Sequence, residues 1–218
     1  MTVDTREMVV IHRVFRRELG LLPRLIRGVP DGDTARAARV TEHLVDVTTG
    51  LTTHHTGEDE LLWPLLLERV TLEAGLVRRM EAQHEVVHER IGETQQMAAR
   101  WAEHADVPSR DELAVAVDQM YAALVEHLDD EEQLVLPIVA EHITQPEWDA
   151  LGDHGRASLP KGKKSLLFLG AILEDATDEE RAEFLARVPL PGRVMWRLAG
   201  QRAYAREIHQ VRGDLVRV

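Results

Sequence analysis

The segment HHTGEDELLWP, residues 54–64, has a second copy in HLDDEEQLVLP, residues 127–137. The two copies align without a gap at an offset of 73 residues: each begins with His, has Glu four residues later and ends with Pro. A second pair of matching segments, around His12 and His84, lies upstream at an offset of 72 residues. A repeat of this length is a structural unit rather than a short solenoid period, so the chain is built from a doubled unit.

The spacing within each copy has a chemical consequence. Residues four apart in a helix lie on one face, so His54 and Glu58 present an imidazole and a carboxylate in the same direction. His127 and Glu131 repeat this arrangement. Both groups are metal ligands, and iron, zinc and manganese all accept them.

Composition limits the class of protein. The 218 residues suit one domain, or one domain with an extension. There is no cysteine, which excludes disulfides and thiolate ligands. The first residues lack a secretory signal, no apolar run approaches the roughly 20 residues of a membrane helix, and the net charge of −12 argues against nucleic acid as a partner. We expect a cytoplasmic protein with no helix that spans a membrane.

The apolar residues predict helices throughout and give no strand signal. Four helices are expected: residues 4–28, a second from about residue 33, residues 72–104, and a fourth that opens with the capping box Ser109–Glu112. The stripe on the fourth alternates steps of four and three, which is typical of an antiparallel bundle; its members are Leu113, Val117, Met120, Leu124, His127, Glu131, Leu134 and Ile138.

Polar residues fall on the inward faces of all four helices. The face expected on the second helix carries His43, Val47, Gly50, His54 and Glu58. Buried polar groups need partners, and five histidines and two glutamates at matching depth would be costly without a cation. The candidate metal ligands are therefore His12, His54, Glu58, His84, His88, His127 and Glu131.

This combined pattern resembles the hemerythrin-like family, also called HHE cation-binding domains, over about residues 4–143. The resemblance implies an up-down-up-down four-helix bundle with a non-haem di-iron site, oxo- and carboxylate-bridged. It also implies that His84, His88 and His127 hold one iron, that His12 and His54 hold the other, and that Glu58 and Glu131 bridge them. Hemerythrin proper places its second bridging carboxylate five residues after the His, at Glu132 here. We prefer Glu131, because it matches Glu58 in the repeat.

The two predicted iron positions are unequal. Arg16 occupies the place in the first half that His88 occupies in the second, so one iron has three imidazoles and the other two. A metal with an open position binds or transforms small molecules. The resemblance to the hemerythrin-like family implies that this small molecule is O2 or a related diatomic gas, which the protein binds or senses. The alternatives are a di-iron enzyme acting on peroxide or O2, and iron handling.

Two further readings involve other histidines. His84-Glu85-x-x-His88 matches the zinc peptidase motif H-E-x-x-H, which we keep as a remote alternative. His55 follows a ligand and points about 100° away from it on the helix, so it is expected beside the site or exposed, or as a substitute for His54.

The last third of the chain differs in charge from the rest. Residues 1–150 hold 29 acidic and 14 basic residues, whereas residues 151–218 hold 9 and 12. The composition changes near residues 145–160, so we divide the chain into residues 1–145, the bundle, and 146–218, a helical extension. The extension should pack on the bundle through apolar residues, among them Trp196, Leu198 and Tyr204. A contact with another protein or an anionic membrane is the alternative.

Overall fold

The computed structural model describes residues 2–158 and 162–213, and these residues form helices and no strands. Pro160, Lys161 and residues 214–218 of the predicted extension lie outside the described part. The described residues fall into two compact units: the first contains Phe15–Ser158 and the residues before Arg6, and the second contains Arg6–Val14 and the residues after Leu159.

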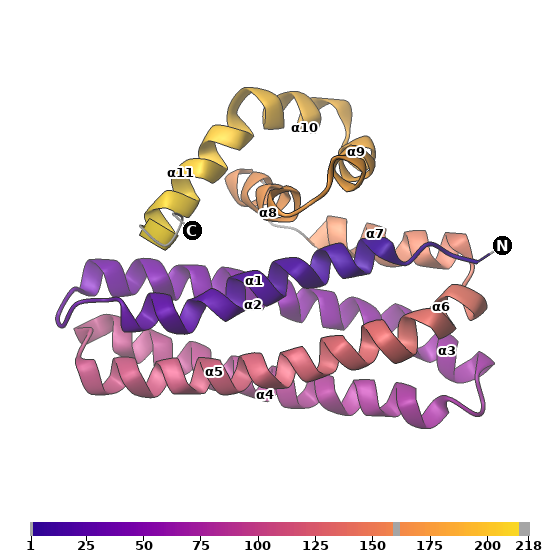
Figure 1. The fold of residues 1–218 in the computed structure, drawn as a ribbon, viewed down its shortest axis with the longest axis horizontal. Helices are drawn as coiled ribbons and strands as arrows, with labels where there is room; N and C mark the ends of the chain where they lie inside the picture. The colour runs from indigo at the N-terminus through magenta and orange to yellow at the C-terminus, as the bar shows by residue number, and fades with distance from the viewer. Residues whose placement is uncertain (1, 159–161, 214–218) are drawn as a thin grey trace. The chain divides into compact units, whose positions relative to one another are not determined.

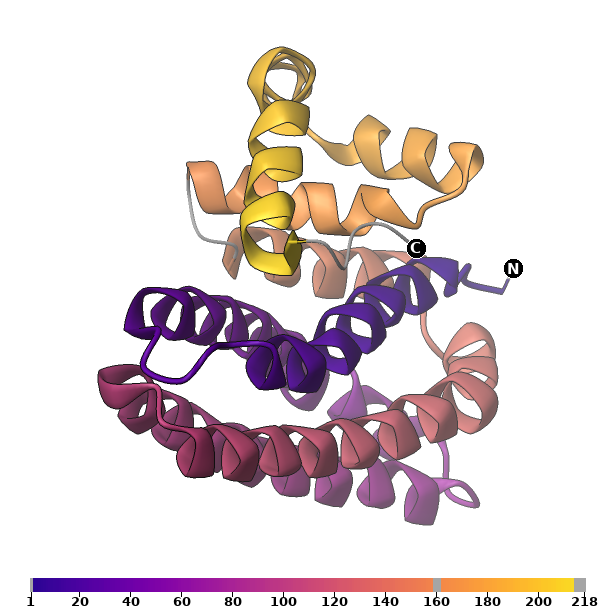
Figure 2. The same cartoon turned by 60° about the vertical axis from the view of Figure 1, so that its left-hand side comes forward.

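The first unit contains four long helices, the later part of α1 (Arg6–Arg27), α2 (Thr34–Leu61), α4 (Ala74–His104) and α5 (Val107–Asp130). These helices lie side by side in Figures 1 and 2. Side chains join α1 to both of its neighbours: Glu18 contacts His43 of α2 at 3.2 Å, and Arg27 donates to Asp118 of α5 at 2.6 Å. The shorter helices of this unit are α3 (Trp63–Arg69), α6 (Leu136–His142) and α7 (Gln145–Ser158).

Periodic burial explains why these segments are helical. The buried side of α4 follows steps of three and four residues, which is the period of a helix with one face in a core: Val77, Met80, His84, Val87, Ile91, Thr94, Ala98 and Trp101. Asp33 caps α2, where its carboxylate accepts from the Arg36 N–H at 3.0 Å. Asp106 caps α5 in the same way, so this helix begins at Val107, before the capping box predicted at Ser109–Glu112.

A π-helical turn, η1 (Glu131–Val135), joins α5 to α6. A π turn holds more residues than an α turn, so every later side chain is rotated relative to a regular α-helix. Leu134, expected on the inner face, is therefore 44% exposed, and Val135 is buried in its place. Glu131 is the first residue of this turn.

Helix α7 belongs to the first unit and packs on α2. Gly57 leaves room for this approach, because a Cβ there would lie 3.1 Å from His154 Cδ2 and 3.2 Å from Leu151 Cδ1, closer than ordinary van der Waals contact. Arg69 at the end of α3 also binds the first turn of α7, since its guanidinium donates to both oxygens of Glu147 at 2.6 and 2.8 Å.

The second unit holds α8 (Lys163–Glu174), α9 (Asp178–Arg187), α10 (Leu190–Met195), the π turn η2 (Trp196–Gly200) and α11 (Gln201–Arg212). Its small core joins the start of α1 to α8 and α9, and contains Val10, Val14, Phe168, Ile172 and Phe184. Thr177 and Glu180 form the predicted capping box of α9. No helix in the described residues combines the length and the apolar character needed to span a membrane.

Candidate metal centre

Two groups of candidate ligand atoms lie inside the helices, and within each group all the atoms are within 4.8 Å of one another. The first group consists of His55, Glu58, His84 and His127, and the second of His12, His54, Glu58 and Glu131. Glu58 belongs to both groups. The seven residues come from α1, α2, α4, α5 and the first residue of η1.

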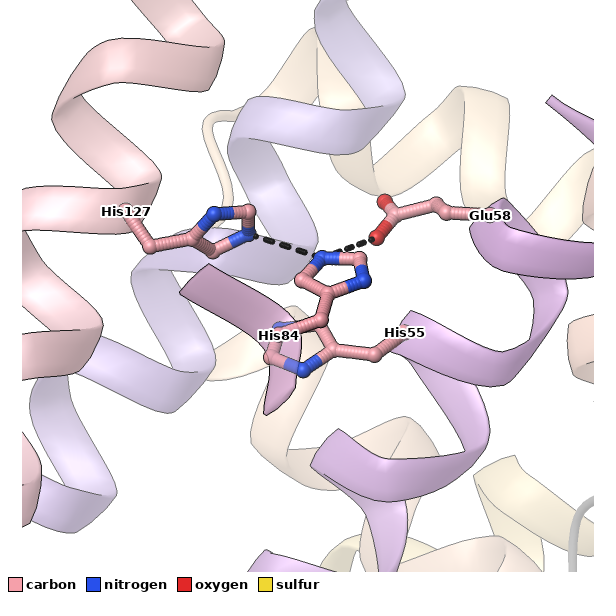
Figure 3. Close-up of side chains that lie close together, drawn as sticks. All are labelled: His55, Glu58, His84 and His127. Atoms are coloured by element: carbon pink, nitrogen blue, oxygen red, sulfur yellow. Dashed lines mark hydrogen bonds and ion pairs between the residues drawn. The ribbon is translucent and has the colours of Figure 1, made fainter. Parts of the chain in front are cut away.

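Two imidazoles of the first group, those of His84 and His127, converge through their Nε2 atoms. His84 Nε2 lies 3.1 Å from His127 Nε2 and 3.4 Å from Glu58 Oε2, and Figure 3 shows these three side chains pointing toward one another. In the second group, His54 Nε2 is 3.2 Å from Glu58 Oε1. His127 Nε2 is 3.7 Å from Glu131 Oε2, so each carboxylate lies near imidazoles of both groups.

The outer nitrogens of two imidazoles have their own partners. His84 Nδ1 lies 2.7 Å from Asp59 Oδ1, and His127 Nδ1 lies 3.3 Å from Gln83 Oε1. Both partners accept hydrogen bonds at these oxygens, so each Nδ1 carries the proton and Nε2 presents its lone pair inward. The amide of Gln83 donates in turn to Asp130 at 2.8 Å. This is the outer support that orients a metal-bound imidazole in proteins.

Two buried carboxyl groups at the centre of the site need a cation to balance their charge. Both Glu58 and Glu131 are fully buried. Burial raises the pKa of the Glu58 carboxyl well above its ordinary value, and the nearby Glu131 and Asp59 carboxylates raise it further. A bound cation offsets both effects, because it supplies the opposite charge at close range. The donor set of imidazole and carboxylate therefore fits a metal of the iron, zinc or manganese type.

Two aromatic side chains lie against the site. Trp63 is fully buried, and its ring centroid lies 5.8 Å from that of His84. The Phe15 ring lies 5.4 Å from that of His54. The rings of His55 and His84 stack at 3.9 Å with an interplanar angle of 11°, which fixes two candidate ligands against each other.

The structure brings six of the seven sequence-predicted ligands together, and His88 is the exception. His88 is exposed and belongs to neither group. The buried face of α4 continues from His84 to Val87, three residues later. Residue 88 lies about 100° round the helix from Val87, which places its side chain outside this buried face. His84 and His88 thus do not converge as the zinc peptidase motif requires.

His55 was not among the predicted ligands, although the sequence placed it beside the site, on the surface, or as a substitute for His54. It is buried and contributes to the first group. The inner face of α2 is offset by one position from the one expected: its buried residues include Leu44, Thr48, Leu51, His55 and Glu58, whereas His43 is only partly buried. The steps of three and four among these residues are a signal in the sequence that would have found His55.

Glu131 and Glu132 differ in environment. Glu131 is fully buried in the second group, whereas Glu132 is partly exposed. The guanidinium of Arg16 donates to Glu132 at 3.2 Å and to Asp129 at 2.8 Å. The ion pair directs the Glu132 carboxylate toward Arg16.

Comparison with known families gives the same assignment as the geometry. The family model described as the hemerythrin HHE cation binding domain matches residues 3–139, which is more than half of the chain. The protein belongs to this hemerythrin family. Comparisons with curated proteins and with solved structures gave no match. The predicted resemblance is thus confirmed, and the histidine and glutamate groups identify a metal-binding hemerythrin-like protein.

Proposed function

We propose that this hemerythrin-like protein holds two non-haem iron ions and binds or senses O2 or a related diatomic gas. The single observation that supports this most strongly is the sharing of Glu58 between two buried ligand groups. A carboxylate with one oxygen 3.2 Å from His54 and the other 3.4 Å from His84 is suited to bridge two ions. Glu131 is the second proposed bridge.

The proposed ligands include His12 and His54 for one ion, and His84 and His127 for the other. The sequence names His88 as the third imidazole of the latter ion, whereas its place in the structure supports His55. Either choice gives one ion three imidazoles and the other two. The ion with two then keeps an open coordination position.

The chain's own residues supply the rest of the function. Iron, when bound, supplies a reversible redox couple and a position for a small ligand. Asp59 and Gln83 hold the protons of the outer imidazole nitrogens, which keeps the inner nitrogens available. Phe15 and Trp63 place apolar rings beside His54 and His84, and apolar surroundings favour a small neutral gas over polar ligands.

The fold proposed with this function is an up-down-up-down bundle in residues 1–145, with residues 146–218 as a helical extension. The connection from α4 to α5 is only two residues, Ala105 and Asp106, and a short connection places successive helices antiparallel. The connection from α1 to α2 is also short, residues 28–33.

The test is metal analysis combined with optical spectroscopy. Protein reconstituted anaerobically with Fe²⁺ should contain about two iron ions per chain, as its two ligand groups require. Its spectrum should change on exposure to O2 and return when O2 is removed. Rapid turnover of peroxide or O2 without a stable bound state would favour the enzyme alternative instead. One zinc ion per chain and no iron would contradict the proposal.

A further inference from the structure

One face of the second unit exposes apolar side chains in a line. Leu190, Val194 and Leu198 follow one another at intervals of four residues along α10 and η2, and they are 65%, 46% and 70% exposed. Met195, beside them, is 51% exposed. The sequence predicted that Trp196 and Leu198 would both pack inward; Trp196 is buried, at 6% exposed, whereas Leu198 is not. We call Leu190, Val194, Met195 and Leu198 the exposed apolar line.

Arginines run beside this line. Arg193 follows Leu190 by three residues and Arg197 follows Val194 by three, so each arginine is a neighbour of a member of the line on the helix surface. Residues 184–206 contain five arginines and no acidic residue, in a chain with a net charge of −12. One of these five, Arg187, pairs with Glu7 inside the unit, as the later Arg212 does with Glu174.

The remaining four arginines of residues 184–206 form no ion pair inside the described part of the unit. They are Arg193, Arg197, Arg202 and Arg206. Exposed cations without partners, next to exposed apolar side chains, form a surface that complements one that is both anionic and apolar. We propose that the exposed apolar line and its arginines bind the surface of an anionic lipid bilayer.

The chemistry of the face favours lipid over a protein partner. Its exposed apolar members are aliphatic or thioether side chains, whereas the aromatic Trp196 that would anchor a protein interface points into the unit. Leu190, Val194 and Leu198 project from a helix, and a fluid bilayer adapts to such a convex surface. Since no described helix can span a membrane, the helix would lie in the plane of the headgroups.

The experiment uses the full chain and two kinds of lipid vesicle. Vesicles of phosphatidylcholine alone are compared with vesicles in which phosphatidylglycerol supplies negative charge, and bound protein is separated by flotation. The protein should float with the anionic vesicles and remain unbound with the neutral ones. Added salt should release it, because the Debye length falls to about 3 Å at 1 M.

Paired variants test the charge. Arg193→Gln with Arg197→Gln should weaken anionic-vesicle binding more than tenfold, since each arginine near such a surface contributes about fivefold. The matched control is Arg78→Gln with Arg100→Gln, which removes the same charge from exposed positions on α4. An equal loss in both double variants would overturn the proposal, because net charge alone would then explain binding.

A second pair tests the apolar line. Val194→Gln with Leu198→Gln should also lower binding, and Leu72→Gln, at a residue 94% exposed on the first unit, should not. Both substitutions are at exposed positions, so the melting temperature should not change. Failure of the wild-type chain to bind anionic vesicles would overturn the proposal. If the chain instead self-associates, and the 194/198 variant abolishes that, the face binds a second copy and not lipid.

Discussion

At the scale of single residues, the identity of the third imidazole is open to a direct test. His55→Ala should lose metal, because the buried His55 ring lies in the first ligand group and stacks on His84. His88→Ala should retain it, because His88 is exposed. The measurement is the number of iron ions per chain in each of the two variants after gel filtration. Metal loss in the His88 variant with retention in the His55 variant would restore the ligand set predicted from the sequence.

The two acidic residues at the start of η1 give a second pair of variants. Glu131→Ala should lose metal, because this carboxylate is fully buried beside the imidazoles. Glu132→Ala should keep the metal and lose the ion pair with Arg16. An exposed pair of this kind contributes about 0–1 kcal/mol, so the melting temperature should change little. The opposite result would show that the carboxylate five residues after His127 is the bridge.

The hydrogen bond from His84 to Asp59 predicts an effect on affinity without loss of a ligand. Asp59→Asn removes the negative charge that fixes the outer proton of His84. Loss of such a partner weakens metal affinity by roughly 10–100-fold. Competition with a chromophoric chelator measures the change, and Glu60→Gln, at the neighbouring exposed acid, is the control. Equal affinities in the two variants would mean that Asp59 does not orient the imidazole.

At the scale of helices, the sequence predicted their existence better than their exact faces. The long stripes of α4 and α5 follow from the regular recurrence of apolar residues, which depends on local sequence alone. The inner face of α2 was displaced by one residue, since α2 also carries threonines and glycines that leave its apolar side weakly defined. The π turn at Glu131 has no local signal: a single additional residue in a turn is decided by packing around the site.

The junction between α3 and α7 predicts a dependence of stability on pH. Hydrogen bonds from Arg69 and then from Thr144 lower the pKa of Glu147 far below its ordinary value of 4.5. A carboxyl group whose pKa is lower in the folded chain stabilises it above the unfolded pKa and loses this effect as pH falls toward the folded pKa.

Glu147→Gln should therefore lower the melting temperature at pH 7, and the difference from wild type should shrink as the pH falls below about 4.5. Added salt should also reduce this difference in melting temperature, because the ion pair between Arg69 and Glu147 is partly exposed and salt screens it. The comparison is made by thermal unfolding at several pH values, with Asp149→Asn, in the next turn of α7, as the control. A difference that stays constant with pH would show that the ionised carboxylate is not what stabilises the junction.

At the scale of the whole molecule, all the candidate ligands precede α7, yet α7 is packed beside them. Gly57 lies between His55 and Glu58, and it receives Leu151 and His154 of α7. The sequence offered no reason to connect residues 145–158 to the site, because the contact depends on the absence of a side chain at one position. Composition did indicate the change to a basic extension, since charge is visible without the fold.

Two truncated chains separate the role of α7 from that of the later helices. The chain ending at Ser158 should keep its metal, and chelation should lower its stability by about 3 kcal/mol if free metal exceeds the dissociation constant 100-fold. The chain ending at His142 should hold metal more weakly and melt at a lower temperature, because α2 loses the helix packed at Gly57.

Both truncated chains should also self-associate, since Val10 and Val14 lose the apolar side chains of α8 that cover them. Metal analysis measures how much metal each truncated chain holds, and thermal unfolding with and without chelator measures its stability. Light scattering measures self-association. Equal metal affinity in the two chains would show that α7 does not support the site. Loss of metal from the chain ending at Ser158 would show that the later helices are needed to hold α1, and with it His12, in place.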